Sequence, residues 1–242
     1  MNKYDLKKLS KGQRDIRRRI LIISHKLNLS HLGSCLSSVD LIDAVYSIKS
    51  KNEKFILSNG HAGIALYTIL EKYGLLKAGE SEKLHVHPDR NPAVGVDVST
   101  GSLGQGLPIA LGIALSNRGK NVYCMISDGE STEGSIWESL RIIRDQKINN
   151  LKILINVNGW GAYAPIPKDS LYKRLKGFAP DIKRINGHDT QQIVKALKSK
   201  KENIIFAETK VNQFPFLKDQ GAHYYIMSNE DFTLAMELLH DY

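Results

Sequence analysis

Three short segments of almost uninterrupted apolar residues constrain the fold of this chain most strongly. They are NVYCMIS at 121–127, LKILINVN at 151–158 and NIIFAETK at 203–210, and segments with helical spacing separate them. Strands that are apolar on both faces are typical of parallel sheets covered by helices, because both faces must then be buried. The sequence therefore predicts an α/β fold, with a mostly parallel central sheet and helices on both faces.

The rest of the chain continues this alternation. KFILSNGHAGIALYTILEKYG at 54–74 predicts a short strand, a turn and a helix, and IKRING at 182–187 predicts a weak strand. The tail after 210 is polar and aromatic, and no element is assigned to it. Further helices are predicted by spacing and capping residues at 12–28, at 38–48 behind a Ser-Val-Asp cap, within 102–119, and at 133–146 and 189–201. No repeat or linker interrupts the pattern, so we expect one domain over 1–242.

Charge and cysteine content exclude several classes of protein. The formal charge is +9, but much of it comes from LKKLSKGQRDIRRRI and KALKSKKEN, which we interpret as solvated helix faces. Without a recognised nucleic-acid module this charge favours attraction of phosphorylated small molecules over nucleic acid. Cys35 and Cys124 lie far apart in apolar contexts, so neither a disulfide framework nor a zinc site is expected. No apolar run reaches membrane-spanning length, and we expect a cytoplasmic protein with no membrane partner.

Polar residues gather where two of the expected strands end. Asp128 follows the strand at 121–127, Asn158 follows the next strand, and STGSLGQG at 99–106 leads into a helix. Ligands of parallel sheets bind at the carboxyl ends of the strands. Carboxylate and amide oxygens suit Mg²⁺ or Ca²⁺, and a glycine loop before a helix can hold a phosphate. Each feature alone is also explained by an ordinary turn or helix cap.

The motifs around these positions resemble the transketolase family. An Asp-Gly pair followed 30 residues later by Asn158 is similar to the thiamine-diphosphate motif of that family, although Ser127 stands where its first glycine is usual. The other matching motifs occur in transketolase order: SHLGS at 30–34, LSNGHAGIALY at 57–67, VHPD at 86–89, GVDVSTGSLGQGL at 95–107, DGESTEGSIWE at 128–138 and NGHD at 186–189. The chain resembles only the first of the family's three domains, as in the N-terminal subunit of a split transketolase with a thiamine-diphosphate-binding fold.

The resemblance implies a set of cofactor-binding residues for thiamine diphosphate and Mg²⁺ (or Ca²⁺). Asp128 and Asn158 would bind the metal through side-chain oxygens, and Trp160 through its backbone carbonyl. The backbone at Gly129, together with Asn158, would hold the diphosphate. The glycine loop would flank the cofactor through Gly101, Ser102 and Leu103.

The resemblance also implies catalytic residues. Four histidines match those that surround the reacting carbon and the sugar hydroxyls in transketolases, where imidazoles can donate or accept protons: His31, His61, His87 and His223. His85 has no counterpart. Glu133 matches a glutamate that faces the partner across the dimer interface. Glu138 either does the same or stabilises a helix N-terminus as a first-turn acid.

The implied activity is transfer of a two-carbon ketol unit from a ketose or ketose phosphate to an aldose or aldose phosphate. A glutamate that this chemistry requires lies on the family's second, pyrimidine-binding domain. We therefore expect a partner chain, the C-terminal transketolase subunit, in an α2β2 heterotetramer, and no activity from this chain alone. Residues 208–225 depart from the family pattern, since Val211, Asn212, Gln213 and Phe214 stand where glycines are usual, which leaves the acceptor open.

Other interpretations of the sequence predict different features. Deoxyxylulose-phosphate synthase would carry the second domain on the same chain, and 2-oxo-acid dehydrogenase α subunits lack this order of motifs. A nucleotide-binding Rossmann protein would have G-x-G-x-x-G after its first strand, whereas GSLGQG lies near residue 100. A non-catalytic transketolase-like paralogue that binds or regulates a partner remains the alternative, although such a protein would be expected to lose metal ligands or histidines.

Overall fold

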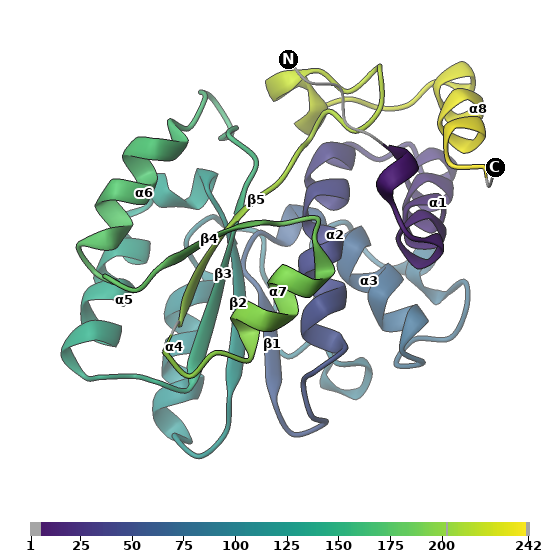
Figure 1. Ribbon diagram of the computed structural model, residues 1–242. Coiled ribbons are helices and arrows are strands. Elements are labelled where there is room, and N and C mark those ends of the chain that lie inside the picture. Colours follow the sequence, from purple (N-terminus) through teal and green to yellow (C-terminus); the bar gives the residue numbers. More distant parts are fainter. Residues whose placement is uncertain (1–5, 202, 241–242) are drawn as a thin grey trace.

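A parallel five-stranded sheet forms the centre of the molecule, as the apolar segments predicted (Figure 1). The computed structural model describes residues 6–201 and 203–240. The strands are β1 (Lys54–Leu57), β2 (Val122–Ser127), β3 (Leu151–Val157), β4 (Lys183–Asn186) and β5 (Ile204–Glu208), in the order β1-β2-β3-β5-β4. All neighbouring strands run parallel, so their carboxyl ends share one edge of the sheet.

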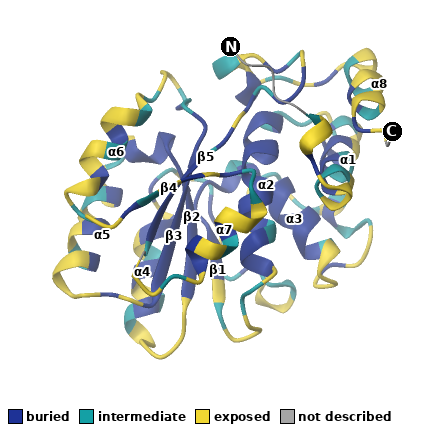
Figure 2. Ribbon diagram, viewed as in Figure 1, coloured by how far each residue is buried: buried dark blue, intermediate teal, exposed yellow. Residues whose placement is uncertain are grey.

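Helices cover both faces of this sheet and enclose two separate apolar cores. On one face lie α1 (Lys11–Lys26), α2 (Leu32–Tyr46), α3 (Gly63–Lys72), α7 (Thr190–Leu197) and α8 (Asn229–Leu238). On the other face lie α4 (Gly106–Ser116), α5 (Gly134–Asp145) and α6 (Lys168–Lys176). Alternate strand residues enter opposite cores: Met125 and Leu154 pack with the first group, and Cys124 and Ile153 with the second. Strands β2 and β3 are therefore buried on both sides (Figure 2), whereas the edge strand β4 buries only Ile185.

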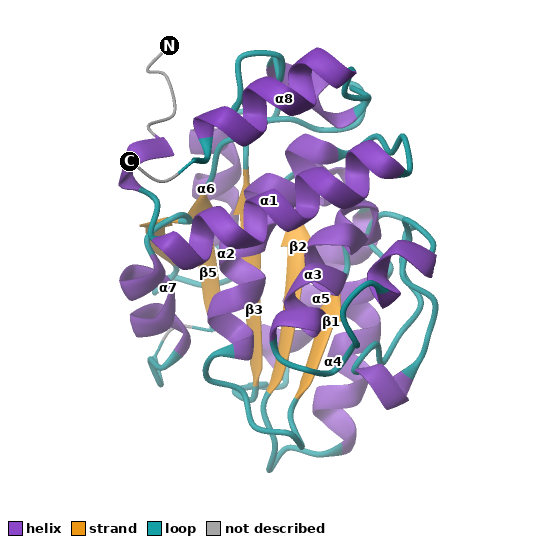
Figure 3. Cartoon of the chain, turned by 90° about the vertical axis from the view of Figure 1, so that its right-hand side faces the viewer, coloured by secondary structure: helices purple, strands orange, loops and turns teal. Residues whose placement is uncertain are grey.

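Helix α2 lies at the centre of the larger layer and differs from the helix predicted at 38–48. It begins at Leu32, and Ser38 is a fully buried residue in its middle. The Ser-Val-Asp prediction was wrong because small buried residues (Gly33, Ser34 and Cys35) extend the helix toward its N-terminus without an amphipathic pattern. Figure 3 shows α2 between the sheet and the outer helix α1, which explains why nearly every residue of it is buried.

Two helices occupy regions where the sequence predicted none. Helix α6 follows the loop after β3 and buries Leu171 and Leu175. Helix α8 starts in the tail, where Ser228 and Asp231 form a reciprocal capping box. The same device opens α1, as Ser10 accepts from the backbone N–H of Gln13 while the Gln13 side chain accepts from Ser10. Local capping thus fixes where both outer helices of this layer begin.

The basic segment of α1 is not simply a solvated face. Arg17 is fully buried and forms a two-pronged ion pair with Asp40 of α2. The interpretation of this segment as solvated was wrong at Arg17, because the periodicity of α1 turns that position toward α2. Within residues 6–201 and 203–240, no helix has the length and apolar character needed to cross a membrane.

Candidate functional site

A cavity opens at the carboxyl ends of β2 and β3, where the sequence placed its candidate ligands. Its volume is about 190 Å³. Its walls come from the N-terminus of α2, the turn after β1, the glycine loop before α4, the ends of β2 and β3, and the segment 219–225. The lining residues are His31, Ser34, Asn59, His61, His87, Gly101, Leu103, Ser127, Gly129, Asn156, Asn158, Trp160, Gly161, Ala162, His223 and Tyr224.

Asp128 and Asn158 lie at adjacent strand ends, as predicted, and the backbone fixes both side chains. The Asp128 carboxylate accepts the N–H of Gly159 at 2.6 Å and that of Gly129 at 3.1 Å. Asn158 accepts the N–H of Trp160 through Oδ1 at 2.9 Å. Burial raises the pKa of Asp128 to about 7, even though these backbone bonds favour the charged form. A buried carboxylate of this kind gains stability when a cation is placed beside it.

Glycines let the backbone approach closely on both sides of the cavity. A Cβ at Gly101 would lie 2.8 Å from the ring of His87, and Gly101 has a φ of +157°. A Cβ at Gly129 would lie 3.2 Å from the Cα of Gly161. The two loops therefore present backbone rather than side chains at these points, which is what a phosphate group requires.

A buried glutamate that the sequence analysis did not assign, Glu130, ties these loops together. Its carboxylate accepts the hydroxyl of Ser58 at 2.5 Å, the N–H of Gly104 at 3.0 Å and the N–H of Ser127 at 2.8 Å. These donors come from the turn after β1, the glycine loop and the end of β2. Burial raises the pKa of Glu130, while the three donors oppose that rise. Nothing in the sequence distinguished Glu130 from the neighbouring acids, because its partners are far away in the chain.

The four histidines predicted to act together do lie in one cluster. The ring centroid of His31 is 5.3 Å from that of His61 and 6.3 Å from that of His87, and His61 is 6.4 Å from His223. Burial, reinforced by the neighbouring imidazoles, lowers the pKa of His31 to about 4 and that of His61 to about 3. Burial also lowers the pKa of His223. These three imidazoles are therefore neutral near pH 7 and can accept a proton.

Several buried polar atoms at this cavity have no hydrogen-bond partner within the described ranges. They are His31 Nδ1, His223 Nε2 and Asn59 Oδ1. The other ring nitrogen of His223 is 2.6 Å from the hydroxyl of Ser34, so only Nε2 is left for a ligand. Buried polar atoms without partners are costly unless something binds them. Asn59 was missed as a candidate, although its position beside His61 in LSNGH was a usable signal.

Comparison with known proteins assigns the chain to a family. Residues 26–210 match the family described as transketolase, thiamine diphosphate binding domain. The chain belongs to this family. A transketolase from Pongo abelii is 32% identical over 192 residues, which cover 69% of this chain and 31% of that protein, so this chain spans about a third of such full-length relatives. A solved transketolase variant from Pichia stipitis, 20% identical, superposes with a TM-score of 0.83 over 95% of this chain and 40% of its own.

Two relatives are named as single subunits of transketolases. One, from Actinobacillus succinogenes, belongs to an apulose-4-phosphate transketolase and is 28% identical over the whole length of both chains. The other, from a Clostridium species, belongs to a 6-deoxy-6-sulfo-D-fructose transketolase and is 31% identical over 73% of each chain. The fold is that of a transketolase thiamine-diphosphate-binding domain, and chains of this extent occur as separate subunits in the relatives.

The residues of this transketolase-family cavity fit the family's cofactor. The backbone cradle at Gly101 and Gly129 suits a diphosphate, and the unpartnered histidine and asparagine atoms face the space beyond it. A cation would find one carboxylate, one amide oxygen and the carbonyl of Trp160, which lies 3.8 Å from the Cβ position of Gly129. In the described part of the chain, no cluster of three or more histidine, cysteine or acidic side chains offers another metal site.

Four predicted or considered residues are not among those that line the cavity: the fully buried Asp128, behind the wall, and Ser102, Glu133 and Glu138. Ser102 is exposed, with its neighbours Gly101 and Leu103 lining the cavity. Glu133 is the N-cap residue of α5, and it lies against Gly104 at the outer side of the glycine loop. Glu138 is exposed and pairs with Arg141 at 2.6 Å, one turn along α5. This ion pair gives Glu138 a local role on the helix surface.

Proposed function

We propose that this chain is the cofactor-binding subunit of a two-chain transketolase. The observation that carries the proposal is the placement of two kinds of group in one cavity. A backbone cradle with Asp128 and Asn158 lies on one side, and neutral imidazoles with unpartnered nitrogens lie on the other. A non-catalytic paralogue would have no reason to keep costly unsatisfied groups around such a cradle.

Cofactor binding follows from the cradle. When bound, thiamine diphosphate supplies the reactive carbon that carries a two-carbon unit between sugars. The side chains of Asp128 and Asn158 and the carbonyl of Trp160 would hold Mg²⁺ or Ca²⁺ beside the diphosphate. Backbone groups at Gly129 and in the glycine loop at 101–103 would bind the diphosphate itself. The buried carboxylate of Glu130 holds these loops in position through its hydrogen bonds.

Proton transfer follows from the histidine cluster. His31, His61 and His87 would accept or donate protons at the hydroxyls of the donor ketose and the acceptor aldose as carbon–carbon bonds break and form. His223 would act through Nε2, because its Nδ1 is committed to Ser34. The low pKa values of His31 and His61 favour the neutral ring, in which one nitrogen accepts and the other donates a hydrogen bond to a sugar hydroxyl.

A partner chain would complete the site. We propose that it carries the pyrimidine-binding domain and its glutamate, and that two copies of each chain form an α2β2 heterotetramer. Glu133, beside the glycine loop, would face the partner across this interface. Cys35 and Cys124 are buried free thiols, which agrees with a reducing, cytoplasmic setting.

Calorimetric titration tests this proposal. Thiamine diphosphate with Mg²⁺ is titrated into the wild type and Asp128→Ala, each alone and mixed with a candidate chain that carries the pyrimidine-binding domain. Loss of a metal ligand should weaken cofactor binding by more than about 100-fold. Asp181→Ala, an aspartate-to-alanine change at an exposed site, should bind as the wild type does. A wild type that ignores the cofactor inside a confirmed complex would refute the proposal.

A further inference from the structure

Tyr224 stands at the mouth of the cavity and is not explained by cofactor binding. It belongs to the cavity wall, and 54% of it is exposed. Its ring centroid lies 6.3 Å from that of His31, with the two planes tilted by 53°. The ring is therefore partly in contact with solvent and adjacent to His31 of the histidine cluster.

The phenol of Tyr224 is anchored across the mouth. Its hydroxyl donates to the carbonyl of Ala162 at 2.7 Å, and the side-chain amide of Gln220 donates to the same oxygen at 2.8 Å. Ala162 belongs to the loop after β3 that also carries Asn158 and Trp160. Two hydrogen bonds thus join the 219–225 segment to the loop that holds the proposed metal ligands.

The other side of the 219–225 segment packs on α2. The N–H of His31 donates to the carbonyl of His223 at 2.7 Å. A Cβ at Gly33 would lie only 2.8 Å from the Cβ of Ala222, so the segment packs directly on the helix backbone. Because both flanks are held, the ring of Tyr224 is a fixed part of the mouth rather than a surface side chain free to swing away.

The residues that line the cavity behind Tyr224 include no aspartate or glutamate in the part of the chain that the structure describes. Within the described ranges, neither lysine nor arginine lines the cavity, although the chain carries a charge of +9. This chain's wall therefore offers a sugar phosphate no cation inside the cavity. The dimension of the mouth is then a property through which this subunit can distinguish sugars of different length.

We propose that Tyr224 is a specificity-determining residue whose ring limits the length of the aldose that can reach the histidine cluster. The inference rests on the proposed transketolase function and extends it to acceptor selection. The ring sets the steric limit, and the hydroxyl bond to Ala162 keeps the ring in place. A short aldehyde fits within the cavity behind the ring. A longer aldose must extend past the ring, which obstructs it.

Kinetics of the assembled two-chain enzyme test the inference. The ratio of kcat/KM for a five-carbon aldose to that for glycolaldehyde should rise about tenfold in Tyr224→Ala, the scale of discrimination that small changes of pocket size produce. Tyr224→Phe keeps the ring and should change the ratio less. Tyr163→Ala is the matched control, since Tyr163 is 93% exposed beside Ala162, and should leave the ratio unchanged.

Chemical labelling of this chain alone supplies a readout independent of catalysis. Diethyl pyrocarbonate modifies neutral imidazoles, and peptide mass spectrometry reports each histidine separately. His31 should react several-fold faster in Tyr224→Ala than in the wild type or Tyr163→Ala, with exposed His85 as the internal reference.

The outcomes separate this inference from the proposed function. A complex inactive toward every sugar pair overturns the proposed function and the acceptor role with it. An active complex with an unchanged acceptor ratio overturns the acceptor role alone. The acceptor role also fails if Tyr224→Ala only weakens assembly with the partner, which would make Tyr224 an interface residue, or if labelling of His31 does not accelerate.

Discussion

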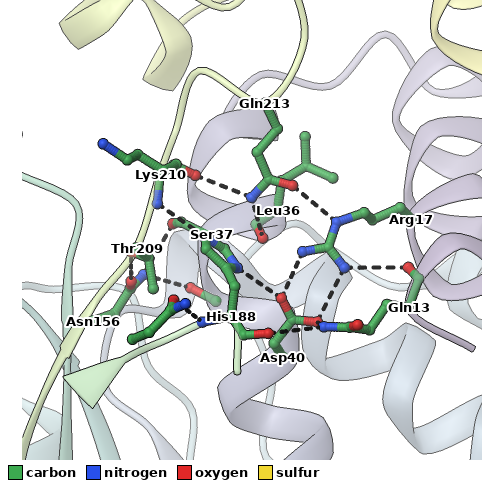
Figure 4. A network of polar contacts seen from close by, with 12 residues as sticks. Gln13, Arg17, Leu36, Ser37, Asp40, Asn156, His188, Thr209, Lys210 and Gln213 are labelled. Atoms are coloured by element: carbon green, nitrogen blue, oxygen red, sulfur yellow. Dashed lines mark hydrogen bonds and ion pairs between the residues drawn. The ribbon is translucent and has the colours of Figure 1, made fainter. Parts of the chain in front are cut away.

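Two buried polar clusters lie along α2, and they differ in how completely their hydrogen bonds are satisfied. Near the middle of the helix, the Asp40 carboxylate accepts hydrogen bonds from Arg17 at 2.6 and 3.0 Å and lies 2.7 Å from Nδ1 of His188 (Figure 4). Gln213 accepts from Arg17 and donates to the carbonyls of Leu36 and Lys210. At the N-terminus of the same helix, His31 leaves Nδ1 without a partner among the described residues.

The two histidines show what this difference means. His188 receives the N–H of Lys210 on Nε2, so its proton is on Nδ1 and points to Asp40. Both of its nitrogens are used inside the protein. His31 is also partly buried, but its Nδ1 has no such bond, and burial lowers its pKa to about 4. A saturated cluster stabilises the fold, whereas an unsaturated one has polar atoms available for a ligand.

The largest effect on stability should follow from breaking the saturated cluster. Arg17→Met removes one partner of a buried ion pair and should cost about 3–5 kcal/mol in the free energy of unfolding, measured by urea denaturation. Arg141→Met, the same change at the exposed pair with Glu138, should cost nothing measurable. Adding Asp40→Asn to Arg17→Met should recover part of the loss, because the uncompensated charge is gone. Equal losses at Arg17 and Arg141 would contradict the assignment.

A smaller effect should separate the two histidines. His188→Asn cannot bridge Asp40 and Lys210, and we expect a loss of about 1–3 kcal/mol in unfolding free energy. His31→Asn should change stability little, because Nδ1 has no bond to lose and asparagine tolerates the left-handed conformation of His31, whose φ is +65°. Its cost should instead be in kcat of the assembled enzyme. If His31→Asn destabilises as much as His188→Asn, the contrast between the clusters fails.

The smallest effect concerns the slope of stability against pH. The unfolded chain protonates its histidines near 6.5, whereas His31 and His61 resist protonation down to about 4 and about 3 because they are buried. The contribution of these two histidines to stability is therefore complete above pH 6.5 and is lost as the pH drops toward about 3. His61→Asn should flatten this slope in urea titrations. Asp40 contributes in a more acidic window. Burial alone would raise its pKa, but the Arg17 charge and the His188 bond hold it well below its ordinary 3.8. If the slope is unchanged in His61→Asn, the buried histidines are not the origin of the pH dependence.

The sequence predicted those elements whose determinants are local. The strand at 151–157 and its neighbour at 122–127 were placed within a residue, because apolar runs buried on both faces are conspicuous. Asp128 and Asn158 were found from their positions at the ends of these strands. The four histidines proposed to be catalytic came from the family resemblance, and the structure brings them together in space.

The features that the sequence did not reveal depend on contacts between distant segments. Glu130 gathers donors from three loops, and Arg17 meets Gln213 from the far end of the chain. Gln213 was noted only as a departure from the family's glycines, yet it binds α1, α2 and its own loop at once. Such roles follow from the order of the strands and the seating of the tail, which hydrophobic periodicity does not encode.

The seating of Ala222 and His223 on α2 has a consequence for synthesis. The cavity wall is begun by residues near position 31 and finished by residues near 224, so the ribosome releases the closing segment only after all five strands. Until then, the histidines His31, His61 and His87 face an open groove, and Gly33 has no chain packed on it. Domains begin to fold while synthesis continues. A nascent chain of this protein can therefore build its sheet first, but it acquires a closed cavity only when the 219–225 segment arrives.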